Sequence, residues 1–97
     1  LVHEHRREKD RVRLYHLDCY RLKNADDVES IGFEDIIDGR GVVIIEWPER
    51  IKAALPKQYL WVQLRVLDPS RRNLIFEGNS ERYSALINRY REATFGV

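Results

Sequence analysis

The 97-residue sequence contains no methionine, one cysteine, three prolines and five glycines. The single cysteine, Cys19, excludes an internal disulfide and fits a reducing compartment, so we expect a cytoplasmic protein. No apolar run approaches the ~20 residues that a membrane-spanning helix needs, and no signal peptide is visible. Because the chain opens on Leu1 without a methionine or a leader, we expect it to begin partway through a longer protein.

The sequence also lacks an excess of charge of either sign. It has 17 Lys and Arg against 16 Asp and Glu, which gives a net charge of +1. That balance provides no general attraction to nucleic acid or to a membrane surface. The hydrophobic fraction of 43% and the charged fraction of 34% are typical of a globular protein. The length favours a single domain over residues 1–97.

The hydrophobic pattern predicts an α/β protein. Apolar and alternating runs predict strands over residues 2–5, 11–19, 42–45, 59–67 and 73–77. Short helical segments are expected over 25–31, 33–37 and 48–55, and Asn24 is a suitable N-cap for the first of them. Apolar residues recurring from Tyr83 to Tyr90 at helical spacing predict a final amphipathic helix that lies on a sheet.

The stretch from Val42 to Pro48 is the most informative. Its four apolar residues read as a strand buried on both faces, as in parallel sheets. The strand ends in Glu46 and Trp47, and Pro48 suits the first turn of a helix. Ligands of open α/β sheets bind at the carboxyl ends of the strands. Glu46 is therefore a candidate site residue, although an acid at this point also occurs where it only starts a helix.

Asp18 ends the second predicted strand in the same way. If the two strands are neighbours, Asp18 and Glu46 meet at one edge of the sheet, where two carboxylates suit Mg²⁺. Alternatively, one acid holds the metal and the other orients an attacking water. His3, His5 and His16 could form a metal site with Asp18, but scattered histidines are more often surface or packing residues.

Two motifs together resemble the TsaE (YjeE) family. The first is His-Leu-Asp-Cys-Tyr-Arg-Leu at residues 16–22, and the second is Val-Ile-Ile-Glu-Trp-Pro-Glu-Arg at residues 43–50. An acidic helical spacer with Ile31-Gly32 separates them. The segment Leu-Val-His-Glu at residues 1–4 is similar to the one that follows the family's Pro-Thr-Phe element. The resemblance covers nearly the whole chain in order.

The resemblance implies a P-loop NTPase-like mixed sheet with flanking helices and a C-terminal antiparallel hairpin plus helix. It also implies ATP binding and hydrolysis with Mg²⁺, needed for the N6-threonylcarbamoyladenosine modification at position 37 of tRNAs that read ANN codons. TsaD and TsaB are the implied partners, and tRNA is contacted indirectly through the complex. By the same resemblance, Asp18 is a Walker-B-like metal ligand, Glu46 serves in metal binding and hydrolysis, and Trp47 lies beside the nucleotide.

The chain departs from the family in one respect. A P-loop needs Gly-x-x-x-x-Gly-Lys-Ser/Thr to hold phosphates, and the 97 residues contain no such segment. We expect that loop upstream of Leu1, so that the chain is the C-terminal two-thirds of the domain and is inactive alone. Two alternatives stay open from the residues themselves: a Mg²⁺-dependent nuclease using Asp18 and Glu46, and a non-catalytic protein-binding module in which both acids are structural.

Overall fold

The computed structural model describes residues 2–97, except for the side chains of Ser30 and Ile31. The chain divides into two compact units, Leu1–Pro56 and Lys57–Val97, and each is described by itself. The expectation of a single domain over residues 1–97 stays a prediction.

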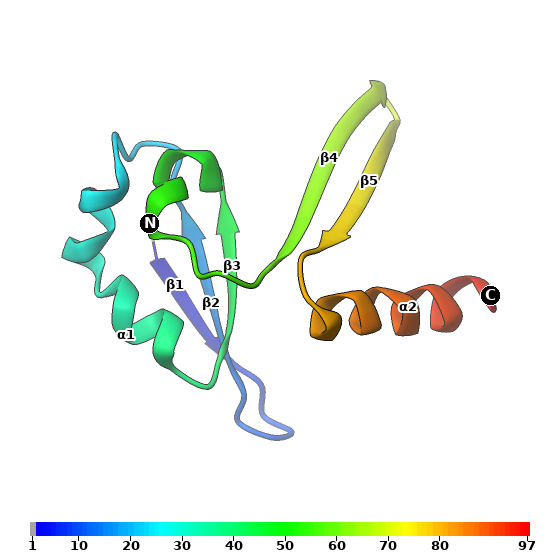
Figure 1. Cartoon of the computed structure of the whole chain (residues 1–97), viewed down its shortest axis with the longest axis horizontal. Helices are drawn as coiled ribbons and strands as arrows, with labels where there is room; N and C mark the ends of the chain where they lie inside the picture. Colours follow the sequence, from blue (N-terminus) through cyan, green and yellow to red (C-terminus); the bar gives the residue numbers. More distant parts are fainter. Residues whose placement is uncertain (1) are drawn as a thin grey trace. The chain divides into compact units, whose positions relative to one another are not determined.

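The first unit contains a mixed three-stranded sheet. Its strands are β1 (Val2–Arg6), β2 (Arg13–Asp18) and β3 (Val42–Glu46), in the order β1-β2-β3. Strand β1 pairs with β2 antiparallel, and β2 pairs with β3 parallel (Figure 1). The predicted mixed α/β architecture is therefore confirmed.

Two short helices connect β2 to β3. The first, η1 (Ala25–Ile31), is a 3₁₀ helix that begins at Asn24, whose side-chain oxygen accepts a hydrogen bond of 3.0 Å from the backbone N–H of Asp26. Gly32, with a φ of 72°, ends η1 and lets the chain turn into α1 (Phe33–Asp38). The predicted N-cap is thus confirmed.

The segment after Trp47 differs from the expected α-helix. It is a 3₁₀ helix, η2 (Pro48–Ala54), and Ile51 within it has non-helical backbone angles of φ −127° and ψ 29°. Ile51 is also fully buried. The break in helical geometry therefore falls at the residue whose side chain is buried. Hydrophobic periodicity alone does not reveal this break.

The core of the first unit lies on one face of its sheet. Its buried side chains come from the sheet's end, the two connecting helices and η2, and they are Leu17, Cys19, Val28, Phe33 and Ile51. Val43 and Ile45 of β3 pack against this cluster from the same side. Alternation along each strand sends the remaining side chains to the opposite face.

The prediction that residues 42–45 are buried on both faces is wrong for the residues that the structure describes. Val42 is 54% exposed and Ile44 is 49% exposed. The helices η1, α1 and η2 contribute to a core on the side of Val43 and Ile45 only. The apolar run in the sequence therefore predicts the strand correctly but not the burial of its second face.

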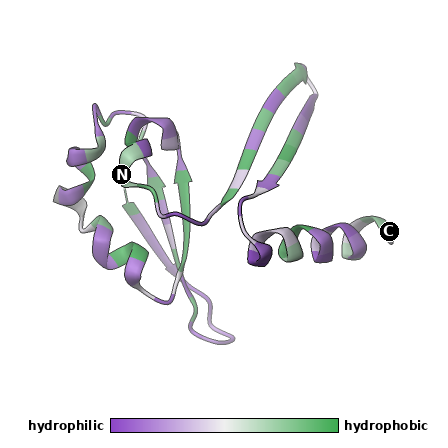
Figure 2. Cartoon of the chain, in the orientation of Figure 1, coloured by the Kyte–Doolittle hydropathy of each residue, from purple (hydrophilic) through white to green (hydrophobic). Residues whose placement is uncertain are grey.

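The second unit is a hairpin followed by a helix, as predicted. Strands β4 (Leu60–Asp68) and β5 (Arg71–Gly78) pair antiparallel, and hydrophobic and polar residues alternate along β4 (Figure 2). Helix α2 (Glu81–Phe95) begins at Ser80, whose hydroxyl accepts from the backbone N–H of Tyr83. Its Tyr90 ring lies 5.5 Å from the Phe76 ring of β5, so the apolar stripe of α2 faces the hairpin at this point.

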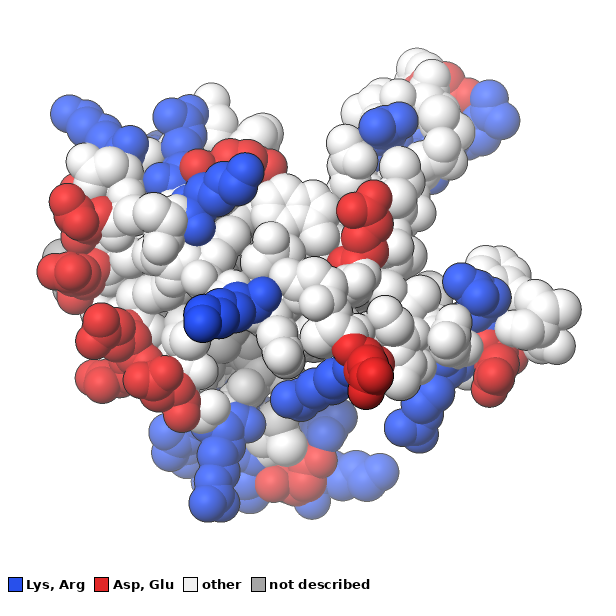
Figure 3. All heavy atoms as spheres, viewed as in Figure 1, with Lys and Arg blue, Asp and Glu red and all other residues white. Residues whose placement is uncertain are grey.

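Charges of both signs are spread over the surface. Within the first unit, acidic side chains gather over η1 and α1, and basic side chains gather around the loop between β1 and β2 (Figure 3). That loop is fastened by an ion pair between Arg7 and Asp10, which raises the pKa of Arg7 and lowers that of Asp10. Among the described residues, no helix has the length and apolar character that crossing a membrane requires.

Candidate functional site

The candidate site begins where β2 and β3 end together. The two strands pair in register, so Asp18 lies directly opposite Glu46. The backbone N–H of Cys19 donates to the carbonyl oxygen of Glu46 at 3.0 Å, which extends the pairing one residue past Asp18. The parallel sheet therefore brings both acidic strand ends to one edge, as their similar sequence contexts predict.

The carboxylate of Asp18 is fixed by the turn that follows it. Its Oδ1 atom accepts a hydrogen bond of 3.0 Å from the backbone N–H of Tyr20, which is the geometry of an Asx turn. The next backbone bond, from Leu22 N–H to Cys19 C=O at 3.1 Å, closes the same turn. Among the described residues, the other carboxylate oxygen, Oδ2, has no hydrogen-bond partner, so it is available to a ligand.

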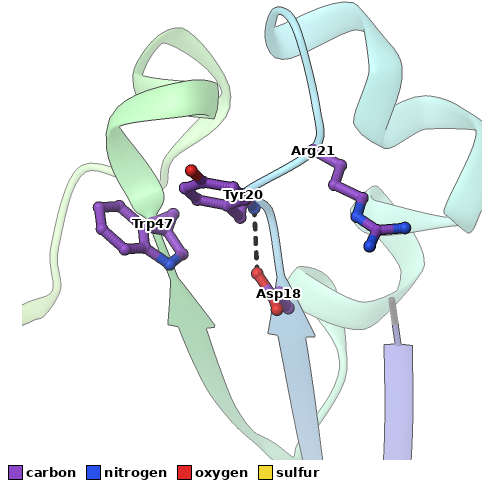
Figure 4. A pocket seen from close by; sticks show the side chains of 4 residues that line it. All are labelled: Asp18, Tyr20, Arg21 and Trp47. Atoms are coloured by element: carbon purple, nitrogen blue, oxygen red, sulfur yellow. Dashed lines mark hydrogen bonds between the residues drawn. The ribbon is translucent and has the colours of Figure 1, made fainter.

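A cavity of about 620 Å³ opens beside Asp18. Asp18, Tyr20, Arg21 and Trp47 line it, and Figure 4 shows the two aromatic rings side by side above the carboxylate. This volume is within the range of sites for small molecules and cofactors. The pocket combines a carboxylate, a guanidinium and two aromatic surfaces, which is a set of groups that suits a polar ligand with a flat ring.

The two rings of the pocket pack against each other edge to face. The rings of Tyr20 and Trp47 lie 5.0 Å apart with an edge-to-face angle of 61°. The guanidinium of Arg50 lies over the Tyr20 ring at 5.5 Å, within the range of a cation–π contact. Tyr20 is 52% exposed and Trp47 is 52% exposed, so half of each aromatic surface remains open to a ligand.

Trp47 has an unusual backbone conformation. Its φ of 58° and ψ of 50° are left-handed, which costs about 1 kcal/mol or more for a residue other than glycine. This conformation turns the chain sharply from the end of β3 into η2, which begins at Pro48. Strain of this kind is found at ligand sites, and here it occurs at the residue that contributes the larger ring of the pocket.

The carboxylate of Glu46 has a different partner from that of Asp18. Its Oε1 atom lies 2.6 Å from Nε2 of His16, a residue on the neighbouring strand. The sequence alone does not reveal this contact, because His16 is one of three histidines scattered among the first two strands. The i, i+2 spacing of His16 and Asp18 places both on one face of β2, but the partner of His16 on β3 follows only from the register of the two strands.

The histidine alternative for a metal site receives no support from the described residues. The rings of His3 and His16 are neighbours, with centroids 6.3 Å apart. However, residues 2–97 contain no group of three or more His, Cys, Asp or Glu side chains arranged to hold a metal ion. The histidine contact that the structure shows is with Glu46.

The two acids fit a hard cation that uses few protein ligands. Asp18 and Glu46 supply oxygen atoms from directly paired positions, and both side chains are exposed at the sheet edge. Mg²⁺ takes one or two carboxylates and completes its octahedral shell with water and phosphate oxygens. The donor set thus suits Mg²⁺ with a phosphate-bearing ligand better than a cation that needs a complete protein cage.

The structure is that of an α/β protein with a candidate ligand site at the carboxyl edge of its parallel strands. The family model described as "Threonylcarbamoyl adenosine biosynthesis protein TsaE" matches residues 1–74. This match covers more than half of the chain, so the chain belongs to the TsaE family, and the resemblance stated from the two motifs is confirmed.

Similar proteins agree with this assignment. The tRNA threonylcarbamoyladenosine biosynthesis protein TsaE of Treponema pallidum is 41% identical over 64 residues, which cover 66% of this chain and 47% of that protein. The Bacillus subtilis protein of the same name is 32% identical over 73 residues, covering 75% and 45%. The crystal structure of Bacillus subtilis YdiB matches with a TM-score of 0.77 and 25% identity, covering 95% of this chain and 55% of that one. The chain therefore spans about half the length of these relatives.

Proposed function

We propose that this chain carries the acidic half of an ATP-hydrolysing site. In the full-length protein, that site serves the N6-threonylcarbamoyladenosine modification at position 37 of tRNAs that read ANN codons. The observation that supports the proposal most is the direct pairing of Asp18 with Glu46 beside an aromatic pocket. Membership of the TsaE family supports the tRNA modification, because the similar proteins are named for that biosynthesis.

Each acid has a distinct role in this proposal. Asp18 holds Mg²⁺ through its carboxylate, whose Oδ1 atom is already fixed by the N–H of Tyr20. Glu46 contributes to metal binding and orients the water that attacks the terminal phosphate. Mg²⁺, when bound, supplies positive charge that stabilises the phosphate oxygens during transfer. Fixing both carboxylates on adjacent strands before the ligand arrives reduces the reorganisation that the reaction requires.

The aromatic pocket binds the nucleotide in this proposal. Trp47 lines the cavity and is 52% exposed, and its left-handed backbone places it at the end of β3. Tyr20 packs against the ring of Trp47 and is itself covered by Arg50. In this proposal the exposed Trp47 ring offers a flat apolar face for a nucleobase, and base–aromatic stacking contributes about 1–3 kcal/mol per base.

The phosphate-binding loop belongs to residues outside this chain in the proposed site. Backbone N–H groups and a lysine of a Gly-x-x-x-x-Gly-Lys-Ser/Thr segment hold phosphates in P-loop enzymes, and the 97 residues contain no such segment. We further propose that the full-length protein acts in the cytoplasm with TsaD and TsaB. Contact with tRNA then runs through that complex.

Alanine substitution of Glu46 tests the proposal. In the full-length protein, Glu46→Ala should reduce ATP turnover by at least about 100-fold, a loss comparable to removing one preorganised charge-stabilising group. Circular dichroism should stay unchanged, because Glu46 is exposed at the end of β3. Glu8→Ala is a matched control, since Glu8 is an exposed acid in the loop between β1 and β2.

Three outcomes distinguish the proposal from its alternatives. Lost ATP turnover with an intact fold supports the ATPase role. Lost strand scission of a nucleic acid substrate, without any ATPase activity in the wild type, indicates a Mg²⁺-dependent nuclease instead. A loss of stability with no activity to lose indicates that the acid is structural and that the chain is a binding module.

A further inference from the structure

His16 occupies a defined place next to the paired acids. It lies on β2 two residues before Asp18, and its backbone is paired with Ile44 of β3 and with His3 of β1. Its Nε2 atom is 2.6 Å from Oε1 of Glu46, which is two residues beyond Ile44. The contact therefore runs diagonally across the parallel pair, from one strand to the end of the next.

The direction of this hydrogen bond follows from the chemistry of the two groups. An ionised carboxylate only accepts hydrogen bonds, so the imidazole must donate through an N–H at Nε2. Hydrogen bonds to a charged acceptor are shorter and about twice as strong as neutral ones. The bond occupies one oxygen of Glu46 and leaves the other, Oε2, for a ligand.

We propose that His16 is a positioning residue for Glu46. By donating to Oε1, the imidazole selects one rotamer of a glutamate that is otherwise free to move, because the Glu46 side chain is 51% exposed at a strand end. The neighbouring His3 ring, at 6.3 Å, limits the space on the opposite side of His16. This inference rests on the proposed function, since it gives His16 a role in the hydrolysis step that Glu46 serves.

A purely structural role explains the contact less well. An exposed ion pair or hydrogen bond contributes little to stability, and both partners of this contact are at least one-third exposed. By contrast, a misplacement of about 1 Å in a reacting group can reduce a rate by about 100-fold. The orientation of Glu46 is therefore the larger consequence of the contact.

The test compares three histidine variants in the full-length protein. His16→Ala should reduce kcat for ATP hydrolysis by about 10- to 100-fold, while KM for ATP stays within about twofold because His16 does not line the pocket. His16→Gln should recover most of the rate, because its amide N–H can donate to the same oxygen of Glu46. His5→Ala is the matched control, since His5 is an exposed histidine on β1, and it should match the wild type.

A spectroscopic measurement gives a second readout without turnover. In ¹⁵N-labelled full-length protein, the His16 side chain should show a hydrogen-bonded Nε2–H signal that is lost in Glu46→Ala. Wild-type kcat in His16→Ala, or equal loss in His16→Ala and His16→Gln, would overturn the positioning role alone. Absence of ATP turnover in the wild type would instead overturn the proposed function, and the positioning role with it.

Discussion

Asp18 and Glu46 occupy equivalent backbone positions but have different side-chain partners. A backbone N–H two residues ahead fixes Asp18, whereas an imidazole on the neighbouring strand contacts Glu46. The pocket that Asp18 lines also contains Trp47. At the scale of the residue, the site therefore consists of two separately oriented carboxylates with an aromatic ring beside one of them.

Cys19 follows Asp18 directly and faces the core instead of the site. It is fully buried, and burial together with the charge of Asp18 raises the pKa of its thiol. We predict that iodoacetamide alkylates Cys19 much more slowly in the folded protein than in urea, because the thiolate is the reactive form. Equal alkylation rates in the folded and unfolded states would contradict the burial of Cys19.

The same pKa shift predicts a pH dependence of stability. In the folded protein the Cys19 thiol keeps its proton at a pH where the thiol of the unfolded chain has lost it. Burial of the protonated thiol therefore adds to the free energy of unfolding at low pH. This contribution should decrease as the pH rises above the ordinary thiol value of about 8.5. The stability difference between the wild type and Cys19→Ala, measured by urea unfolding from pH 7 to 10, should narrow accordingly.

At the scale of the element, the close approach of β2 to the turn before β3 depends on Gly41. A Cβ atom at this position would lie 2.7 Å from the backbone oxygen of Arg13 and 3.1 Å from the Tyr15 ring. We predict that Gly41→Ala destabilises the protein by about 1–3 kcal/mol, the range for an overpacked site. Urea unfolding monitored by circular dichroism measures the change.

Gly39→Ala is the matched control for Gly41→Ala. Gly39 lies in the same turn with an ordinary φ of −76°, and an added Cβ would approach the carbonyl oxygens of Asp35 and Ile36 at 3.3 Å and 3.4 Å. Its effect on stability should be clearly smaller. Similar unfolding midpoints for the two variants would indicate that the approach at Gly41 is not a constraint.

Most elements could be predicted from local sequence, because their signals are local. Alternation identifies β4, the Asn24 cap identifies the start of η1, and the acids after two apolar runs identify the edge of the sheet. The 3₁₀ geometry of η2 and the exposed face of β3 were not predicted, because they depend on which segments cover the sheet. The contact of His16 with Glu46 joins residues 30 positions apart, and only the strand register reveals it.

At the scale of the whole molecule, the helices of the first unit cover one face of its three-stranded sheet. Val42 and Ile44 on the other face are about half exposed, and the chain spans about half the length of its relatives. The family assignment is carried by residues 1–74, which include the whole first unit and both site motifs. We propose ATP binding for the full-length protein only, and in that proposal this chain contributes Asp18, Glu46 and the aromatic pocket.

The most direct test of whether ATP binding needs residues outside this chain is a titration with a fluorescent ATP analogue in the presence of Mg²⁺. The account predicts saturable binding at micromolar concentrations by the full-length protein and no measurable binding by the 97-residue chain, which lacks the phosphate-holding motif. Micromolar binding by the 97-residue chain would contradict the proposal that the phosphate-binding loop lies outside this chain. Failure of the full-length protein to bind would contradict the nucleotide site itself.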